Sequence, residues 1–150
     1  MNILITGGAG FIGSHTADAL IKKGHHVKIL DILKKPVHMN GFPEYLDKTK
    51  VEFIFGDVTN KSTLTYALSN VDIVYHLAAY QDYLPDYSSF SLINVASTSL
   101  IYEIIEEYNL PVKKVILASS QAVMGEGKYH SQEGKVFFPS LRTLKQLSQA

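Results

Sequence analysis

The sequence predicts an α/β fold in which a doubly wound parallel sheet, with strand order 3-2-1-4-5, carries helices on both faces. Short apolar runs alternate with segments of helical spacing, a pattern typical of strands joined by crossover helices. The apolar runs are also nearly continuous, which indicates strands that are buried on both faces. Right-handed crossovers between such strands then give the predicted order.

The elements follow one another in regular alternation along the chain. The apolar runs predict five strands, at Asn2–Thr6, His26–Asp31, Val51–Gly56, Val71–Leu77 and Lys113–Ala118. Apolar residues at helical spacing predict three helices, at Phe11–Lys23, Lys61–Leu68 and Phe90–Tyr108. We expect Gly24 to end the first helix and Asn60 to cap the second. The segment 32–50 has two prolines and no clear period, so it should be mostly loop, and the tail from Pro139 should open another helix.

Composition excludes several kinds of site and partner. The 150 residues suffice for one domain, and 14 basic residues balance 14 acidic ones, so no nucleic-acid partner is expected. There is no cysteine, which excludes a disulfide frame or a thiolate metal site and fits a cytoplasmic protein. No apolar run approaches the length of a membrane span, so no membrane partner is expected. His76 has no metal-ligating partner at a suitable spacing, so we expect a packed strand residue there and no metal site.

A glycine-rich turn, TGGAGFIGSH, joins the first predicted strand to the first predicted helix. Gly8, Gly10 and Gly13 satisfy G-x-G-x-x-G, and Gly7 with the last two satisfies G-x-x-G-x-x-G. Residues without a Cβ allow a pyrophosphate to approach the backbone N–H groups at a helix N-terminus. The alternative is a tight turn that binds no ligand. An acidic residue, Asp31, ends the next strand 18 residues after Gly13, and this combination predicts a dinucleotide site.

Asp31 also indicates which dinucleotide is bound. Its carboxylate is placed to accept hydrogen bonds from the adenosine ribose, and its charge would repel a 2′-phosphate, so NAD is favoured over NADP. The alternative is a strand-end aspartate that caps a turn. Lys34 and Lys35 follow closely and could offset part of the repulsion, although a solvated loop face is the simpler interpretation.

Five motifs carry a resemblance to a known enzyme family. They are TGGAGFIG, GDV at Gly56–Val58, VDIVYHLAA at Val71–Ala79, NVAST at Asn94–Thr98 and SSQAVMGEG at Ser119–Gly127. With these motifs the sequence resembles the extended short-chain dehydrogenase/reductase family of NAD-dependent sugar-nucleotide epimerases and dehydratases, and within it the 4-epimerases. The resemblance implies a Rossmann-type fold, a nucleotide-sugar substrate and a catalytic hydroxyl at Ser120. It also implies a cofactor site formed by Gly7, Gly10, Phe11, Ile12, Gly13, Asp31, Asp57, Val58, Leu77, Ala78, Ala79, Asn94 and Ser119.

Several of these residues have simpler alternatives. Asp57 could cap a helix after its strand, Asn94 could be a structural amide, and the two serines of the last motif could be ordinary strand-end hydroxyls. Ser97 stands where the family has glycine, and Met124 where it has tyrosine.

The residues that follow Ser120 bear on the type of reaction. They are Gln121 and Ala122, whereas dehydratases of the family carry an acidic pair there. The resemblance therefore favours epimerase or reductase chemistry.

The family's proton-transfer pair is missing from these 150 residues. Its chemistry needs Tyr-x-x-x-Lys, in which the lysine lowers the tyrosine pKa so that the phenolate can act as a base. None of the nine tyrosines is followed by lysine at the fourth position, and Tyr129 is followed by Glu133.

We therefore expect residues 1–150 to be the NAD-binding part of a sugar-nucleotide epimerase. This part should be truncated before the catalytic helix and the C-terminal substrate domain, and inactive alone. The alternatives are a non-catalytic NAD-binding or sensing module and the product of a broken gene. The fifth strand should expose an edge through which the chain self-associates or forms a homodimer.

Overall fold

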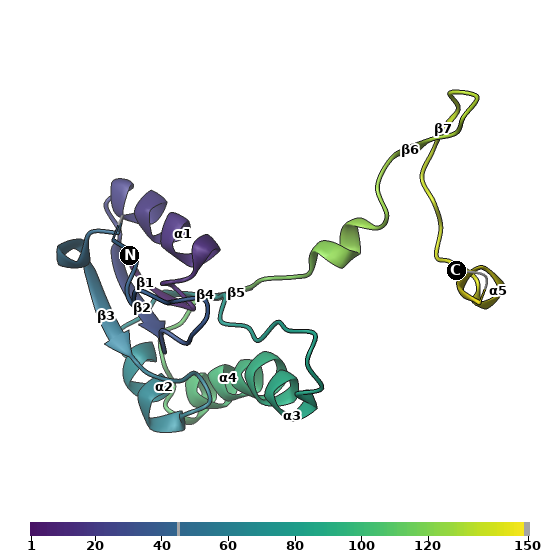
Figure 1. Ribbon diagram of the computed structural model, residues 1–150. Helices are drawn as coiled ribbons and strands as arrows, with labels where there is room; N and C mark the ends of the chain where they lie inside the picture. Colours follow the sequence, from purple (N-terminus) through teal and green to yellow (C-terminus); the bar gives the residue numbers. More distant parts are fainter. Residues whose placement is uncertain (45, 149–150) are drawn as a thin grey trace. The chain divides into compact units, whose positions relative to one another are not determined.

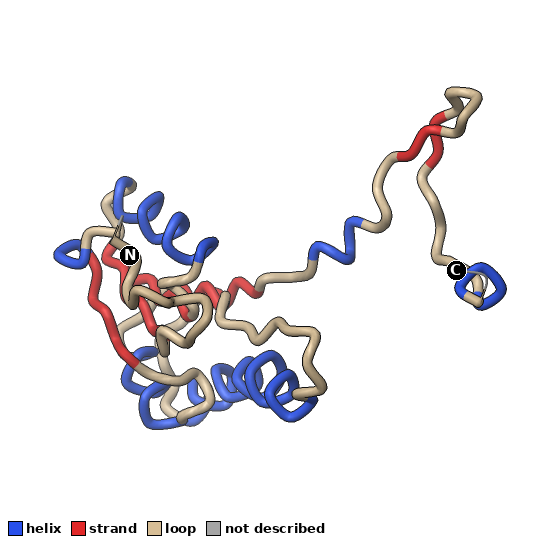
Figure 2. The backbone as a smooth tube through the Cα atoms, viewed as in Figure 1, coloured by secondary structure: helices blue, strands red, loops and turns tan. Residues whose placement is uncertain are grey.

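The computed structural model describes residues 1–44 and 46–148. The chain divides into two compact units, Met1–Ala118 and Ser119–Ala150. The first unit contains a parallel sheet with helices on both of its faces (Figures 1 and 2). The second unit contains a small hairpin and short helices.

The sheet of the first unit confirms the predicted order, β3-β2-β1-β4-β5. Its strands are β1 Asn2–Thr6, β2 His26–Asp31, β3 Val51–Phe55, β4 Ile73–His76 and β5 Lys114–Leu117. The central strand β1 pairs in parallel with β2 and β4, so that Thr6 lies opposite both Leu30 and His76. Because all strands run in the same direction, their carboxyl ends meet along one edge, where ligands bind in such sheets.

The helices cover the sheet from both faces (Figure 1). Helix α1, Phe11–Lys22, lies on one face, while α2, Lys61–Leu68, and α4, Ser97–Glu107, lie on the other. The predicted caps are confirmed. Asn60 accepts a hydrogen bond from the Thr63 N–H at 2.9 Å, and Gly24 follows α1 with a positive φ of 78°. The loop after β2 ends in a 3-10 helix, Lys48–Lys50.

The prediction of one regular helix over Phe90–Tyr108 was wrong in its first part. The helical segment begins with α3, Tyr87–Phe90, continues as a π-helix over Ser91–Ala96, and only then becomes α4. Ser97 Oγ donates to the Ile93 carbonyl at 2.5 Å, a bond that competes with the regular backbone ladder. The apolar spacing is similar in both helix types, so it did not separate them.

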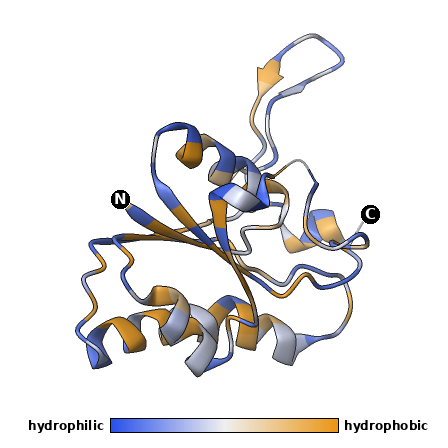
Figure 3. Cartoon of the chain, turned by 90° about the vertical axis from the view of Figure 1, so that its left-hand side faces the viewer, coloured by the Kyte–Doolittle hydropathy of each residue, from blue (hydrophilic) through white to orange (hydrophobic). Residues whose placement is uncertain are grey.

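Two hydrophobic clusters hold the helices on the sheet. Along β1 the side chains alternate, with Ile3 and Ile5 in the cluster on the α1 side and Leu4 in the cluster that includes α2 and α4. Figure 3 shows the strands coloured hydrophobic along most of their length, whereas the helices carry hydrophobic and hydrophilic residues in turn. The buried side chains thus fix the helix N-termini at the edge where the strands end.

The second unit is small and mostly exposed. A 3-10 helix, Gln121–Met124, precedes a hairpin of β6, Tyr129–His130, and β7, Val136–Phe137. The expected tail helix is present as α5, Leu144–Leu147. The hairpin was not predicted, because strands of two residues show no period. In the part of the chain that the structure describes, no helix is long and apolar enough to cross a membrane.

Candidate functional site

The glycine turn packs between the ends of β2 and β4. Gly7 has a φ of 66°, which favours glycine, and its N–H donates to the Leu30 carbonyl at 2.8 Å. A Cβ on Gly7 would lie 2.7 Å from the Ala78 nitrogen. The turn therefore needs glycine here for its own conformation and for contact with the segment after β4.

Two further glycines of the motif have different roles. A Cβ on Gly13 would lie 2.3 Å from the Gly7 oxygen and 2.6 Å from the Gly8 Cα, so Gly13 lets α1 pack on the turn. A Cβ on Gly10 would meet only the Gly7 oxygen, at 3.3 Å. Gly10 is therefore constrained by packing much less than Gly13 is, and the rest of the space around the position of its Cβ is open.

The N-terminus of α1 presents free backbone donors. The first bond within the helix joins the Ser14 N–H to the Gly10 carbonyl at 2.9 Å, so the N–H groups of Phe11, Ile12 and Gly13 have no acceptor in the helix. Gly10 supplies no capping side chain, and the first turn has no acidic residue. The side chains of Phe11 and Ile12 are exposed beside these donors. This end of the helix can bind an anion such as a pyrophosphate.

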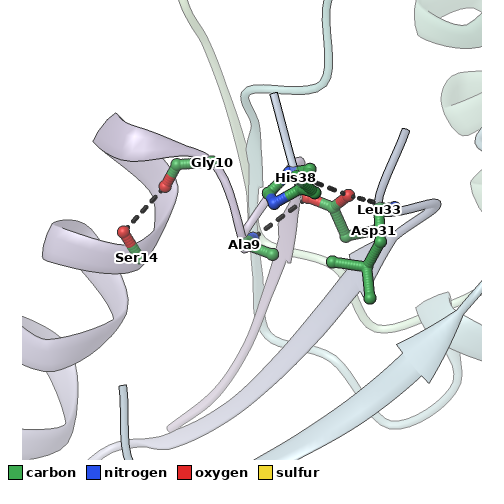
Figure 4. Close-up of polar contacts among 6 residues, drawn as sticks. All are labelled: Ala9, Gly10, Ser14, Asp31, Leu33 and His38. Atoms are coloured by element: carbon green, nitrogen blue, oxygen red, sulfur yellow. Dashed lines mark hydrogen bonds and ion pairs between the residues drawn. The ribbon is translucent and has the colours of Figure 1, made fainter. Parts of the chain in front are cut away.

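Asp31 is joined directly to the glycine turn (Figure 4). Its Oδ2 accepts a hydrogen bond from the Ala9 N–H at 3.0 Å, and its Oδ1 accepts one from the Leu33 N–H at 2.8 Å. The side chain is buried, and His38 Nε2 lies 3.6 Å from Oδ1. Asp31 thus caps its own turn and also contacts the glycine turn, and its contact with the adenosine ribose stays a prediction. His38 lies in the non-periodic loop, where no sequence signal pointed to it.

The end of β3 places Asp57 and Val58 near the same edge of the sheet. Asp57 Oδ1 accepts hydrogen bonds from the N–H and the hydroxyl of Thr59, both at 2.8 Å. The cap of α2 is Asn60, so Asp57 is not a helix cap. Val58 is buried and belongs to the core cluster beside α2. Whether these residues contact a cofactor stays a prediction.

The segment after β4, Leu77–Ala79, is held in place by Asn94 from the π-helix. Asn94 Oδ1 accepts from the Tyr80 N–H at 2.7 Å, and its Nδ2 donates to the Tyr80 carbonyl at 2.9 Å. Both ends of the amide are therefore engaged with the backbone, which is the structural role that the sequence left open. A cofactor contact by Asn94 stays a prediction.

His76 links the same strand end to α4. Its Nδ1 accepts from the Thr6 hydroxyl at 2.6 Å, and its Nε2 lies 3.0 Å from Ser97 Oγ. Since the Ser97 proton is donated to the Ile93 carbonyl, the imidazole carries its proton on Nε2. Burial lowers the pKa of His76 to about 4, so the ring is neutral at pH 7. As expected, His76 is a packed strand residue, and Ser97 gives it a partner that glycine would lack.

Tyr80, which follows β4 near this edge, is not activated as a base. Tyr80 donates a hydrogen bond to Asp86 at 2.5 Å, and this carboxylate raises the pKa of Tyr80 to about 12. A base that works near neutral pH needs the opposite shift. Lys34 Nζ lies 5.0 Å from the Tyr80 ring centroid, so this lysine contacts an aromatic face.

The two serines of the last motif belong to the second unit. Ser120 is exposed, and its Oγ accepts from the Ala122 N–H at 3.1 Å, which caps the 3-10 helix. Tyr129 lies in β6, with its hydroxyl 3.4 Å from Glu126. The cofactor role of Ser119 and the catalytic role of Ser120 stay predictions.

The sheet order, the glycine turn and the acidic end of β2 together define a Rossmann-type dinucleotide-binding fold. The model of the NAD dependent epimerase/dehydratase family matches residues 3–142. The chain belongs to this family, whose members include sugar-nucleotide 4-epimerases and which is NAD-dependent.

Individual relatives agree with this assignment. The dTDP-L-rhamnose 4-epimerase of Burkholderia thailandensis is 32% identical over 153 residues, covering 99% of this chain and 42% of the relative. The decarboxylating sterol-4-alpha-carboxylate 3-dehydrogenase of Mus musculus is 33% identical over 123 residues, which cover 82% of this chain and 31% of the relative. The crystal structure of UDP-glucuronic acid 4-epimerase from Bacillus cereus in complex with NAD matches with a TM-score of 0.70 and 32% identity. The match covers 85% of this chain and 42% of that structure. The chain thus spans less than half the length of these relatives.

Proposed function

We propose that residues 1–150 form the NAD-binding part of a sugar-nucleotide 4-epimerase. The observation that carries this proposal is the glycine turn fixed between β2 and β4, with Asp31 hydrogen-bonded to it. The 4-epimerase assignment is supported by similarity over 99% of the chain to a dTDP-L-rhamnose 4-epimerase. The sterol dehydrogenase matches a smaller share of the chain, so a nucleotide sugar is the favoured substrate class.

The residues present fit NAD at two of its groups, the pyrophosphate and the adenosine ribose. The free N–H groups of Phe11 to Gly13 suit the pyrophosphate, and the open space at Gly10 lets it approach. Asp31 is a carboxylate with remaining acceptor capacity for the ribose hydroxyls. When bound, NAD would take a hydride from the sugar and return it. Ser120 would donate a hydrogen bond to the sugar oxygen in the complete enzyme.

We expect the 150-residue chain to bind NAD weakly and to show no epimerase turnover. The turnover step needs a base, and the chain has no Tyr-x-x-x-Lys pair. Calorimetric titration with NAD measures the binding, and a coupled assay with UDP-glucose and dTDP-sugars measures the reaction. Absence of NAD binding would refute the proposed function, and clear turnover would show that another residue supplies the base.

A second function, a non-catalytic NAD-binding module, is favoured by the raised pKa of Tyr80. The two functions differ in the coding sequence that follows codon 150. Part of an epimerase should be followed in frame by Tyr-x-x-x-Lys, whereas a module that only senses NAD should not, and sequencing this DNA separates them.

We also propose that the free edge of β5 mediates self-association. In the described part of the chain β5 pairs only with β4, and Leu117 is 47% exposed. Sedimentation velocity should show association that increases with concentration and that Leu117→Lys weakens. Tyr66→Lys, on the exposed side of α2, is the control. A monomer at every concentration, or equal effects of both variants, would contradict the role of this edge.

A further inference from the structure

His38 covers the carboxylate that the dinucleotide site depends on. It lies in the loop that follows β2, and its side chain is 9% exposed, while that of Asp31 is 8% exposed. Its Nε2 points to Oδ1 of Asp31 at 3.6 Å (Figure 4). Two side chains that can carry opposite charges are therefore buried against each other at the end of β2.

The hydrogen bonds of Asp31 show why it needs this neighbour. An ionised carboxylate has about four acceptor positions, and the backbone fills one on each oxygen, from Ala9 and from Leu33. A buried carboxylate with so few donors is poorly compensated unless a charge-bearing partner lies nearby. Among the described residues, His38 is the one Lys, Arg or His side chain within ion-pair distance of Asp31.

The lysines of the same loop do not replace His38. Lys34 Nζ lies over the ring of Tyr80, and no ion pair joins Lys34 or Lys35 to Asp31 in the described structure. The glycine turn holds Oδ2 through Ala9, whereas His38 faces Oδ1. The glycine turn thus holds one oxygen, and the loop contacts the other through Leu33 and His38.

We propose that His38 is a positioning residue of the dinucleotide site, which holds Asp31 in the orientation that receives the adenosine ribose and favours NAD over NADP. The inference rests on the proposed NAD binding. A carboxylate contacted on both oxygens keeps its direction and charge toward the ribose. Without His38, Oδ1 keeps only the Leu33 N–H, so Asp31 is held less firmly, and its hydrogen bonds to the ribose and its repulsion of a 2′-phosphate both weaken.

Two substitutions at His38 and one at Asp31 test the proposal. We expect His38→Ala to weaken NAD binding about tenfold, because Asp31 loses the side chain that faces its Oδ1. His38→Gln, whose amide can donate toward the same oxygen, should restore most of the affinity. In an Asp31→Asn background, His38→Ala should change NAD affinity less than about twofold, because coupled residues lose their effect when the partner is removed. Calorimetric titration with NAD and with NADP measures these affinities, and His38→Ala should reduce the preference for NAD.

Controls separate positioning from a general structural effect. His26→Ala removes an exposed histidine at the opposite end of β2 and should leave NAD binding unchanged. Thermal unfolding of each variant shows whether it is folded. A reduced preference for NAD, recovered in His38→Gln, is a result that mere loss of folded protein cannot give.

The outcomes against the proposal are also distinct. If the unaltered chain binds no NAD, the proposed function fails and this inference with it. If the unaltered chain binds NAD and His38→Ala binds it equally well or more tightly, only the inference fails, and tighter binding would show that His38 competes with the ribose. An equal loss in the Asp31→Asn background would show that His38 does not act through Asp31.

Discussion

Lowering the pH from 7 to 5 should reduce the free energy of unfolding by about 2 kcal/mol through His76 alone. The folded-state pKa of His76 is about 4, below the ordinary value of 6.5. As the pH falls below 6.5, the unfolded chain takes up a proton at this residue and the folded chain does not. Stability is therefore lost between pH 6.5 and about 4, at about 1.4 kcal/mol for each pH unit in the middle of that range.

Urea unfolding at several pH values measures this loss, and His76→Gln provides the comparison. The variant has no titrating group at this position, so its stability should depend less on pH over the same range, even if it is lower at pH 7. The carboxylates whose pKa is lowered by lysine or threonine partners, such as Asp72 and Asp47, lose their contribution only as the pH falls to about 4 and below. Equal slopes for both proteins between pH 6.5 and 5 would show that folding does not lower the pKa of His76.

Two glycine substitutions in the same turn should have different effects: Gly13→Ala should reduce stability, whereas Gly10→Ala should reduce NAD affinity. Gly13→Ala places a methyl group 2.3 Å from the Gly7 oxygen, so backbone must move. Overpacking of this kind destabilises the fold by about 3 kcal/mol, and the better helix propensity of alanine stabilises it by about 1 kcal/mol. We expect a net loss of about 2 kcal/mol in the free energy of unfolding.

Gly10→Ala should leave the fold nearly unchanged and impair the site. Gly10 has φ −69° and ψ 174°, which alanine adopts readily, and the added methyl meets one atom at 3.3 Å. It projects into the space before the helix N-terminus, so NAD affinity should fall at least about tenfold. Urea unfolding and NAD titration of both variants measure the two effects. A Gly10→Ala chain that unfolds as easily as Gly13→Ala, or binds NAD normally, would contradict this division of roles.

The sheet was predictable because its physical signals are local and strong. Continuous apolar runs mark strands buried on both faces, and the glycine turn with Asp31 marks where the first strand meets its helix. These signals gave the strand order, the caps at Asn60 and Gly24, and a glycine turn joined to an acidic strand end, which the structure confirms.

The remaining features depend on contacts between distant residues. The π-helix occurs together with the Ser97 bond to the Ile93 carbonyl and the link from Asn94 to Tyr80, and neither contact alters the apolar spacing. His38 meets Asp31 only because the loop folds back over the end of β2. Asn94 could be assigned a cofactor contact from its motif, but its amide pairing with a backbone 14 residues away is visible only in three dimensions.

The π-helix over Ser91–Ala96 also has a consequence for comparing this chain with others. A π-turn holds about one residue more than an α-turn, so every side chain after it is rotated relative to a regular helix. Loss of a single residue here would restore a regular α-turn without breaking the helix, because it removes the residue that the π-turn accommodates, and Ser97 would still face His76. A one-residue gap in this segment is therefore absorbed within one turn, and the residues on either side of it keep their places.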